Sequence, residues 1–231
     1  MSTKSAARRA GILYFVSSLP APFSLVYIPS IFMVAGDATA TANKIRALEF
    51  LFRAGIVAEL LSVTIFIFTG LAFYDLLKSV NKNRALLMLI FVLISVPISY
   101  LNELNRVAAL MFANGAHLFS VAGQPHLDTL ALAFFNLHDN GVLLAQIFWG
   151  LWLFPFGALV FKSGFLPRIL GILLIAAGCG YVAASLTVLL FPPYGDLVFR
   201  ISAVLGGLGE GGTMLWLLIM GAKNLPSPAP A

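Results

Sequence analysis

The chain has 231 residues, of which 60% are hydrophobic and only 10% are charged, and its formal net charge is +5. A soluble domain carries roughly 25% charged residues, so this composition excludes water-soluble enzymes and nucleic-acid-binding domains and indicates a polytopic membrane protein. The basic residues lie in short clusters between long apolar runs, where they act as topology signals that face anionic lipid headgroups. We therefore expect membrane lipids as partners and no nucleic acid.

Six apolar stretches are each long enough to cross a bilayer, which takes about 20 helical residues. They run over residues 11–34, 54–77, 85–110, 138–161, 168–191 and 200–221. The first follows a basic N-terminus, as in a signal peptide, but its apolar run continues to Val34, beyond the roughly 7–15 residues of a signal-peptide core. We interpret it as an uncleaved span. The predicted fold is all-α, with one six-helix transmembrane domain over residues 1–224 and a disordered tail at 225–231.

Basic residues set the orientation of these spans. With the N-terminus inside, nine of them fall at cytoplasmic ends: Lys4, Arg8, Arg9, Lys78, Lys82, Arg84, Lys162, Arg168 and Lys223. Five fall at outer ends: Lys44, Arg46, Arg53, Arg106 and Arg200. The positive-inside rule therefore predicts that both termini are cytoplasmic, in a multi-pass protein of the cell's inner (plasma) membrane.

The connection between the third and fourth spans, residues 107–137, is the longest. It contains turn signals at Asn114-Gly115 and Gln124-Pro125. Its flanks are apolar enough to continue both spans as helices beyond the bilayer. We expect a small outer cap there rather than a separate domain.

Several kinds of chemistry lack the motifs that they need. The single cysteine, Cys179, cannot form an intramolecular disulfide or a zinc site built on a cysteine pair. The sequence has no Gly-x-Ser-x-Gly nucleophile motif, phosphate loop or dinucleotide fingerprint, so serine and nucleotide chemistry have no support. None of the three histidines shows a metal-ligand spacing. We therefore predict no cofactor and assign no metal ligand.

Five segments of the chain resemble the bacterial DUF4386 family. They are Arg8-Arg-Ala-Gly-Ile-Leu-Tyr14, the stretch from Arg53 to Glu59, Tyr74-Asp-Leu-Leu-Lys78, Leu137-His138 with Gly141, and Phe161-Lys-Ser-Gly-Phe-Leu-Pro-Arg-Ile-Leu-Gly171. The resemblance covers nearly the whole chain and is most specific in Ser-Gly-Phe-Leu-Pro-Arg. It implies an integral membrane protein with about this number of spans, and it carries over no catalytic residue or ligand.

Ionisable residues inside the spans are candidates for a functional site, because a charge in lipid costs at least about 2.5 kcal/mol. At 1.5 Å per residue from the inner ends, Glu59 lies about 22 Å up, Glu103 about 26 Å and His138 about 30 Å, near the outer boundary. Glu210 lies about 16 Å up, close to the midplane. We predict an outward-facing polar pocket above Glu210. Its other candidate residues are Glu59, Asn102, Glu103, Arg106 and His138.

Helical spacing connects several of these residues. Asn102, Asn105 and Arg106 share a helix face, and Glu103 can reach Arg106 at i+3. Glu49 and Arg53 stand at i, i+4 if the helix begins early. The expected partners of Glu59, Glu103 and Asp196 are Arg53, Arg106 and Arg200. The alternative interpretation is a paired network that only fixes the outer ends of the helices.

Glu210 stands among five glycines in Gly206-Gly-Leu-Gly-Glu-Gly-Gly212, which allow another helix to approach closely. The first span carries Pro20, Pro22 and Pro29, which free backbone carbonyls for other partners. These two segments together could form a polar pocket floor. The alternative is close packing, with Glu210 hydrogen-bonded to a neighbouring helix.

Three functions remain open. The first is a bundle that binds or moves a small or lipid-like molecule through the outward-facing pocket, and the residue pattern favours it. The second is an intramembrane enzyme, in which carboxylates and His138 act as acid–base or metal-ligating groups on a lipid-phase substrate. The third is an accessory protein whose polar network holds helices together.

Overall fold

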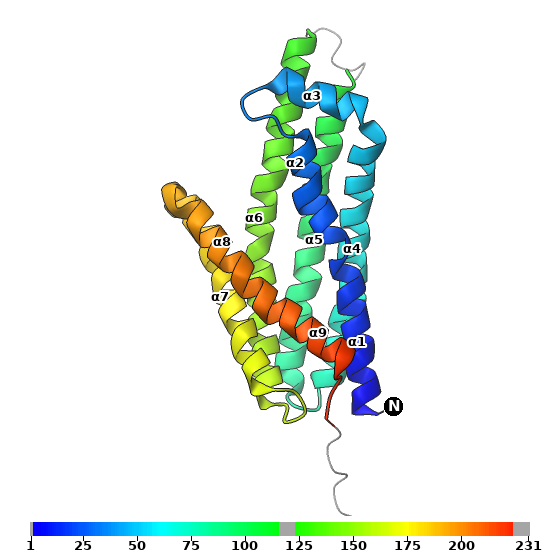
Figure 1. Ribbon diagram of the computed structural model, residues 1–231, viewed down its shortest axis with the longest axis vertical. Helices are drawn as coiled ribbons and strands as arrows, with labels where there is room; N and C mark the ends of the chain where they lie inside the picture. The colour runs from blue at the N-terminus through cyan, green and yellow to red at the C-terminus, as the bar shows by residue number, and fades with distance from the viewer. Residues whose placement is uncertain (1, 116–122, 224–231) are drawn as a thin grey trace, which may run out of the picture. The chain divides into compact units, whose positions relative to one another are not determined.

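The computed structural model describes residues 2–115 and 123–223, and every regular element within these ranges is a helix (Figure 1). Six helical segments are long and apolar enough to cross a membrane: Thr3–Phe32, Glu49–Leu77, Lys82–Ala113, Gln124–Lys162, Arg168–Leu190 and Pro192–Ile219. Each overlaps one of the predicted apolar stretches. The prediction of an all-α polytopic membrane protein is confirmed.

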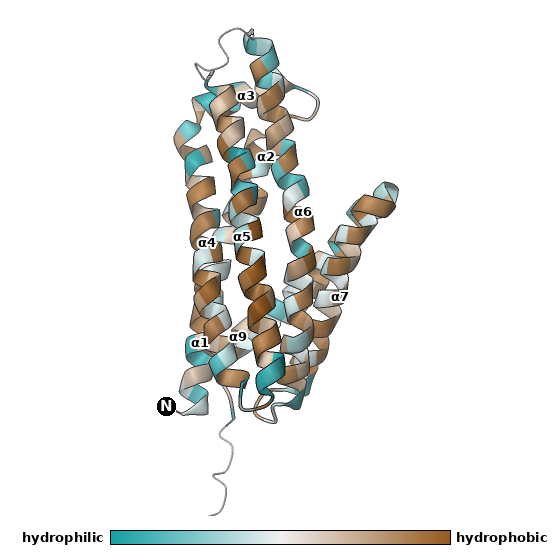
Figure 2. Cartoon of the chain, turned by 180° about the vertical axis from the view of Figure 1, so that it is seen from behind, coloured by the Kyte–Doolittle hydropathy of each residue, from teal (hydrophilic) through white to brown (hydrophobic). Residues whose placement is uncertain are grey.

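The elements in chain order are α1 (Thr3–Ser18), η1 (Pro22–Tyr27), α2 (Ile28–Phe32), α3 (Ala38–Ala47), α4 (Glu49–Leu77), α5 (Lys82–Ala113), α6 (Gln124–Lys162), α7 (Arg168–Leu190), η3 (Pro192–Tyr194), α8 (Gly195–Gly206), η4 (Gly207–Gly211) and α9 (Gly212–Ile219). Hydrophobic residues cover most of α4, α5 and α7, as a lipid environment requires (Figure 2). The predicted tail at 225–231 lies outside the described residues.

The first and last spans each contain a π-helical turn. In η1 the Ile28 N–H donates to the Phe23 carbonyl, five residues back. The second turn, η4, is the glycine-rich segment around Glu210, where the helix is intrinsically weak. π-helical turns are rare in proteins, and many of those that do occur lie at functional sites. Among the described residues, both π-helical turns therefore fall in segments that the sequence analysis singled out: the proline-containing part of the first span and the glycines around Glu210.

The chain divides into two compact units, and α4, α5 and α6 each contribute to both. Unit 1 comprises Met1–Val16, Ile65–Val96 and Leu143–Ala231, and unit 2 comprises Ser17–Thr64 and Pro97–Val142. The single domain over residues 1–224 stays a prediction.

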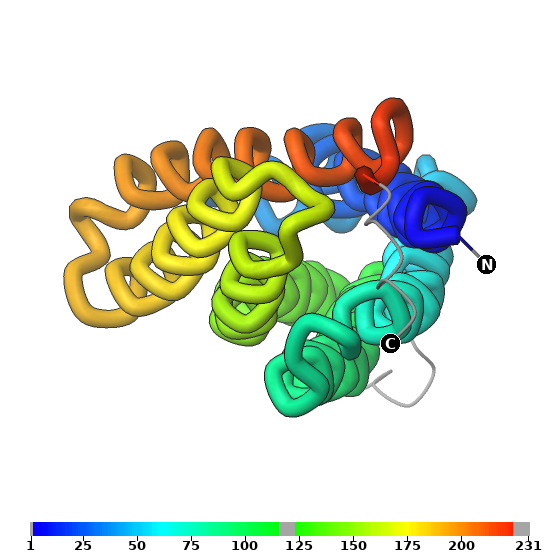
Figure 3. The backbone as a smooth tube through the Cα atoms, turned by 90° about the horizontal axis from the view of Figure 1, so that it is seen from below, coloured from blue at the N-terminus to red at the C-terminus, as the bar shows by residue number. Residues whose placement is uncertain are grey.

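Unit 1 is held together by aromatic packing and by glycine contacts. The Trp152 ring stacks on Phe156 with centroids 5.0 Å apart, and Tyr14 meets Trp152 edge-on. A Cβ atom on Gly157 would lie 2.6 Å from the Gly171 carbonyl, so α6 and α7 approach backbone to backbone. On its other side α7 runs next to α8 (Figure 3). Small residues at helix contacts are the usual basis of packing in membranes, where no hydrophobic force drives helices together.

Unit 2 contains a helix that the sequence analysis did not anticipate. The short helix α3 lies between the first two spans and is capped by Asp37, whose carboxylate accepts the Ala40 N–H at 2.8 Å. Its Arg46 pairs with Asp128 at 2.8 Å and donates to the Ala113 carbonyl at 2.6 Å. The first connection thus secures the ends of α5 and α6, where we had expected only the 107–137 segment to form a cap. Residues 116–122 of that segment lie outside the described residues.

Candidate functional site

Four of the predicted site residues come together in unit 2. We call these four residues the unit-2 cluster: Glu59 on α4, Glu103 and Arg106 on α5, and His138 on α6. Glu103 is the central member, because its Oε1 atom lies 2.7 Å from His138 Nε2 and 3.7 Å from Arg106 Nη1. The pairing of Glu103 with Arg106 is the i+3 contact that the sequence predicted.

Arg106 is held by a serine in the π-helical turn of the first span. Its Nη1 and Nη2 atoms donate to the hydroxyl and to the carbonyl of Ser24, each at 2.8 Å. The turn leaves that carbonyl without a helical partner, because Ile28 N–H already bonds to Phe23 and the residue five positions after Ser24 is Pro29, which has no N–H. The sequence thus supplies a free acceptor inside an apolar span, and a guanidinium from α5 occupies it.

Glu59 completes the cluster from α4. Its carboxylate hydrogen-bonds the Ser24 side chain and interacts electrostatically with Glu103, Arg106 and His138. One of its oxygens, Oε2, has no hydrogen-bond partner among the described residues. The same is true of Glu103 Oε2 and Arg106 Nε. Three charged groups therefore each retain a buried atom with unused hydrogen-bonding capacity.

Asn102 serves the cluster by fixing the position of its neighbours. Its Nδ2 donates to the His138 carbonyl at 2.9 Å, and its Oδ1 accepts from Asn105 at 3.0 Å. A Cβ atom on Gly141 would lie 1.9 Å from Asn102 Oδ1, so only glycine leaves room for this amide. The arrangement gives a physical reason for the spacing of His138 and Gly141.

The cluster is enclosed by protein. Glu59 is 5% exposed, and Glu103, Arg106 and His138 are 3%, 0% and 1% exposed. Asp139 provides a link to the surface, because its Oδ1 lies 3.3 Å from His138 Nδ1 while its side chain is 42% exposed. A pocket open to the outside therefore stays a prediction, and the residues that would line it are buried here.

Glu210 lies in unit 1 and has partners of its own. Its carboxylate accepts a hydrogen bond from the Tyr14 hydroxyl on α1 and another, at 2.6 Å, from the Tyr181 hydroxyl on α7. Glycines make this possible: a Cβ on Gly206 would lie 2.3 Å from the Tyr181 hydroxyl, and one on Gly209 would lie 2.7 Å from the carbonyl of Leu173. This arrangement matches the close-packing interpretation of Glu210. Its role as a pocket floor stays a prediction.

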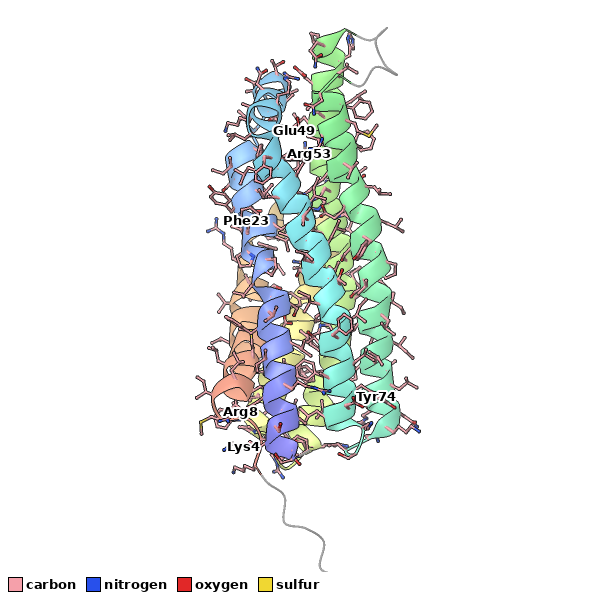
Figure 4. The ribbon with its side chains drawn as sticks, turned by 90° about the vertical axis from the view of Figure 1, so that its right-hand side faces the viewer. Lys4, Arg8, Phe23, Glu49, Arg53 and Tyr74 are labelled. Carbon is pink, nitrogen blue, oxygen red and sulfur yellow. The ribbon has the colours of Figure 1, made fainter. Side chains whose placement is uncertain are left out.

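Sequence reasoning missed Tyr14 and Tyr181, since tyrosine in an apolar span gives no hydropathy signal. It named Arg53 among the partners of Glu59, Glu103 and Asp196 and also noted its i, i+4 spacing from Glu49. The structure pairs Arg53 with Glu49, 2.6 Å away, at the start of α4 (Figure 4). Ser24 lies between Pro22 and Pro29, and the spacing of these two prolines was the signal that could have identified it.

A comparison with protein families identifies the family of this chain. The family model described as "Domain of unknown function (DUF4386)" matches residues 9–221, which include every residue of the unit-2 cluster. The chain belongs to the DUF4386 family. A relative from Archaeoglobus fulgidus, described as an uncharacterized protein, is 30% identical over 168 residues, covering 73% of this chain and 84% of its own length. No solved structure matches.

Proposed function

We propose that this DUF4386 protein binds or moves a small or lipid-like molecule, and that the unit-2 cluster is the binding site. The observation that carries the proposal is that three charged groups of the cluster each have a buried atom without a hydrogen-bond partner among the described residues: Glu59 Oε2, Glu103 Oε2 and Arg106 Nε. Leaving a buried charged group unsatisfied costs roughly 1–3 kcal/mol or more, and the cost rises in a membrane. A polar ligand group that reaches these atoms would remove it.

The charges of the cluster indicate the ligand chemistry. Two carboxylates face one guanidinium and the imidazole of His138, and two of the three unpartnered atoms are carboxylate oxygens, which accept hydrogen bonds. The site therefore suits a molecule that presents hydrogen-bond donors or a positive charge, such as an amine or the amine headgroup of a lipid. An opening of the site toward the outer side and a location of the protein in the inner membrane both follow from the predicted topology. Both belong to the proposal.

One observation favours the second candidate function, an intramembrane acid–base enzyme. His138 stands between Glu103, at 2.7 Å, and the more exposed Asp139, at 3.3 Å. A carboxylate–imidazole–carboxylate chain can carry a proton between the surface and a buried group. The metal-dependent version of this function gains no such support, because among the described residues no group of three or more His, Cys, Asp or Glu side chains is placed to hold a metal ion.

The proposal is tested by ligand-induced thermal shifts in detergent. The wild type, Glu59→Gln and the control Glu49→Gln are melted with ethanolamine, choline and phosphatidylethanolamine, and native mass spectrometry reports any co-purified molecule. Both glutamates lie on α4, but Glu49 lies outside the cluster in an exposed pair with Arg53. We expect a stabilising ligand for the wild type and Glu49→Gln, with a much smaller shift for Glu59→Gln. Equal shifts in all three proteins, or no bound species and no shift, would contradict the assignment.

A further inference from the structure

A groove in unit 1 has a charged end and an apolar end. It has a volume of about 900 Å³ and lies between the first turns of α1 and the last turns of α4. Lys4, Arg8 and Arg9 line one end, and Ile12, Phe68 and Leu71 are among the residues that line the remainder. Its volume falls within the range of small-molecule sites, roughly 300–1,000 Å³.

The three basic residues of the groove carry positive charges that are available to a ligand. None of them takes part in an ion pair among the described residues. Arg8 uses one of its five N–H donors on the Ile219 carbonyl, at 3.2 Å. The acidic lining residue, Asp75, is already paired with Lys78 at 2.7 Å. The charged end is therefore a strongly cationic site, with Lys4 and Arg8 near the start of α1 (Figure 4).

The apolar part is formed by helical spacing on two facing helices. Ile12 lies four residues after Arg8, so an apolar side chain stands one turn beyond a basic one on α1. On α4, Phe68 and Leu71 share a face at i, i+3. These apolar side chains are 53%, 55% and 42% exposed for Ile12, Phe68 and Leu71, so the protein itself does not cover them.

We propose that this groove is a specific site for an anionic phospholipid. Its phosphate would contact Lys4, Arg8 and Arg9, and an acyl chain would follow Ile12, Phe68 and Leu71. The predicted topology places the charged end at the cytoplasmic leaflet, where anionic lipids create a negative surface potential. The inference does not depend on the unit-2 cluster. A free phosphate ion shares the headgroup chemistry, but it would leave the apolar part uncovered.

The test measures affinity by native mass spectrometry for dioleoyl-phosphatidylglycerol, dioleoyl-phosphatidylcholine and inorganic phosphate. The variant Lys4→Gln/Arg9→Gln removes two charges and leaves the Arg8 hydrogen bond in place. Its control, Lys82→Gln/Arg84→Gln, removes two exposed charges at the start of α5, which is predicted to face the same side of the membrane. At about 1 kcal/mol per basic residue near an anionic surface, two charges correspond to roughly thirty-fold in affinity.

We expect phosphatidylglycerol to bind the wild type, to bind Lys4→Gln/Arg9→Gln about thirty-fold more weakly and to bind the control within two-fold of the wild type. Phe68→Gln should weaken phosphatidylglycerol binding without changing phosphate binding, and all variants should melt like the wild type. Equal binding of phosphatidylcholine would overturn the role of charge. If both double variants lose the same phosphatidylglycerol affinity, the binding reflects general surface charge and the specific site is overturned. If Lys4→Gln/Arg9→Gln loses affinity for phosphate but not for lipid, the proposed headgroup contact is overturned.

Discussion

Replacing Arg106 is the sharpest perturbation of the unit-2 cluster. The side chain is fully buried, donates two hydrogen bonds of 2.8 Å to Ser24 and lies 3.7 Å from the Glu103 carboxylate. Arg106→Met keeps a long side chain but leaves the Ser24 carbonyl without its donor and the two carboxylates without their guanidinium. Removing one partner of a buried ion pair costs about 3–5 kcal/mol, because the remaining charge stays buried.

That free energy predicts a drop in melting temperature of roughly 6–20 °C, at about 2–4 °C per kcal/mol for a chain of this length. The assay is thermal unfolding in detergent, followed by tryptophan fluorescence. Arg53→Met is the matched control: it also loses an ion pair, but Arg53 and Glu49 are 57% and 37% exposed, and such pairs contribute under about 1 kcal/mol.

A double variant separates charge from packing. Arg106→Met/Glu103→Gln removes the stranded carboxylate as well, so it should recover part of the stability that Arg106→Met loses. The reasoning is refuted if Arg106→Met melts as mildly as Arg53→Met. It is also refuted if the effects of the two substitutions simply add, so that the double variant is less stable than Arg106→Met by the whole free energy that losing Glu103 costs independently.

Three further predictions follow from individual contacts. Gly141→Ala should lower stability by roughly 1–3 kcal/mol because its Cβ would overlap Asn102, and Asn102→Ala in the same chain should relieve the clash; additive losses in thermal melts would contradict this. Glu210→Gln should melt near the wild type because an amide can still bond both tyrosines, whereas Glu210→Ala should lose roughly 1–3 kcal/mol; equal melting of the two variants would contradict the bonding. In a background without the native thiol, an impermeant reagent applied to intact cells should label Gln124→Cys and not Asn81→Cys, and the reverse pattern would overturn the predicted orientation.

The sequence predicts the spans well because hydropathy over about 20 residues is a strong signal in a bilayer. It also predicts the contact of Glu103 with Arg106, since residues three apart share a helix face. The polar residues of different spans are expected to meet one another, because turning them toward lipid would cost free energy. These inferences need no knowledge of which helices are neighbours.

Other features depend on neighbours and could not be derived in the same way. The partners of Glu210 are tyrosines from two distant segments, and nothing in the local pattern of Tyr14 or Tyr181 distinguishes them from packing residues. The Ser24 carbonyl is free because of Pro29, but only the structure shows that Arg106 reaches it. Helix α3 is short and polar, so it gives no span signal, and its contact with Asp128 appears only in three dimensions.

The central claim is that the unit-2 cluster receives a ligand group at its unpartnered atoms. The most direct measurement is a cryo-electron-microscopy map of the protein in nanodiscs made from its native membrane. The account predicts non-protein density within hydrogen-bond distance of Glu59 Oε2 and Glu103 Oε2, and its loss in Glu59→Gln. A map in which these carboxylates and Arg106 bond only to one another, with no density between them, would contradict the claim and leave the paired structural network in its place.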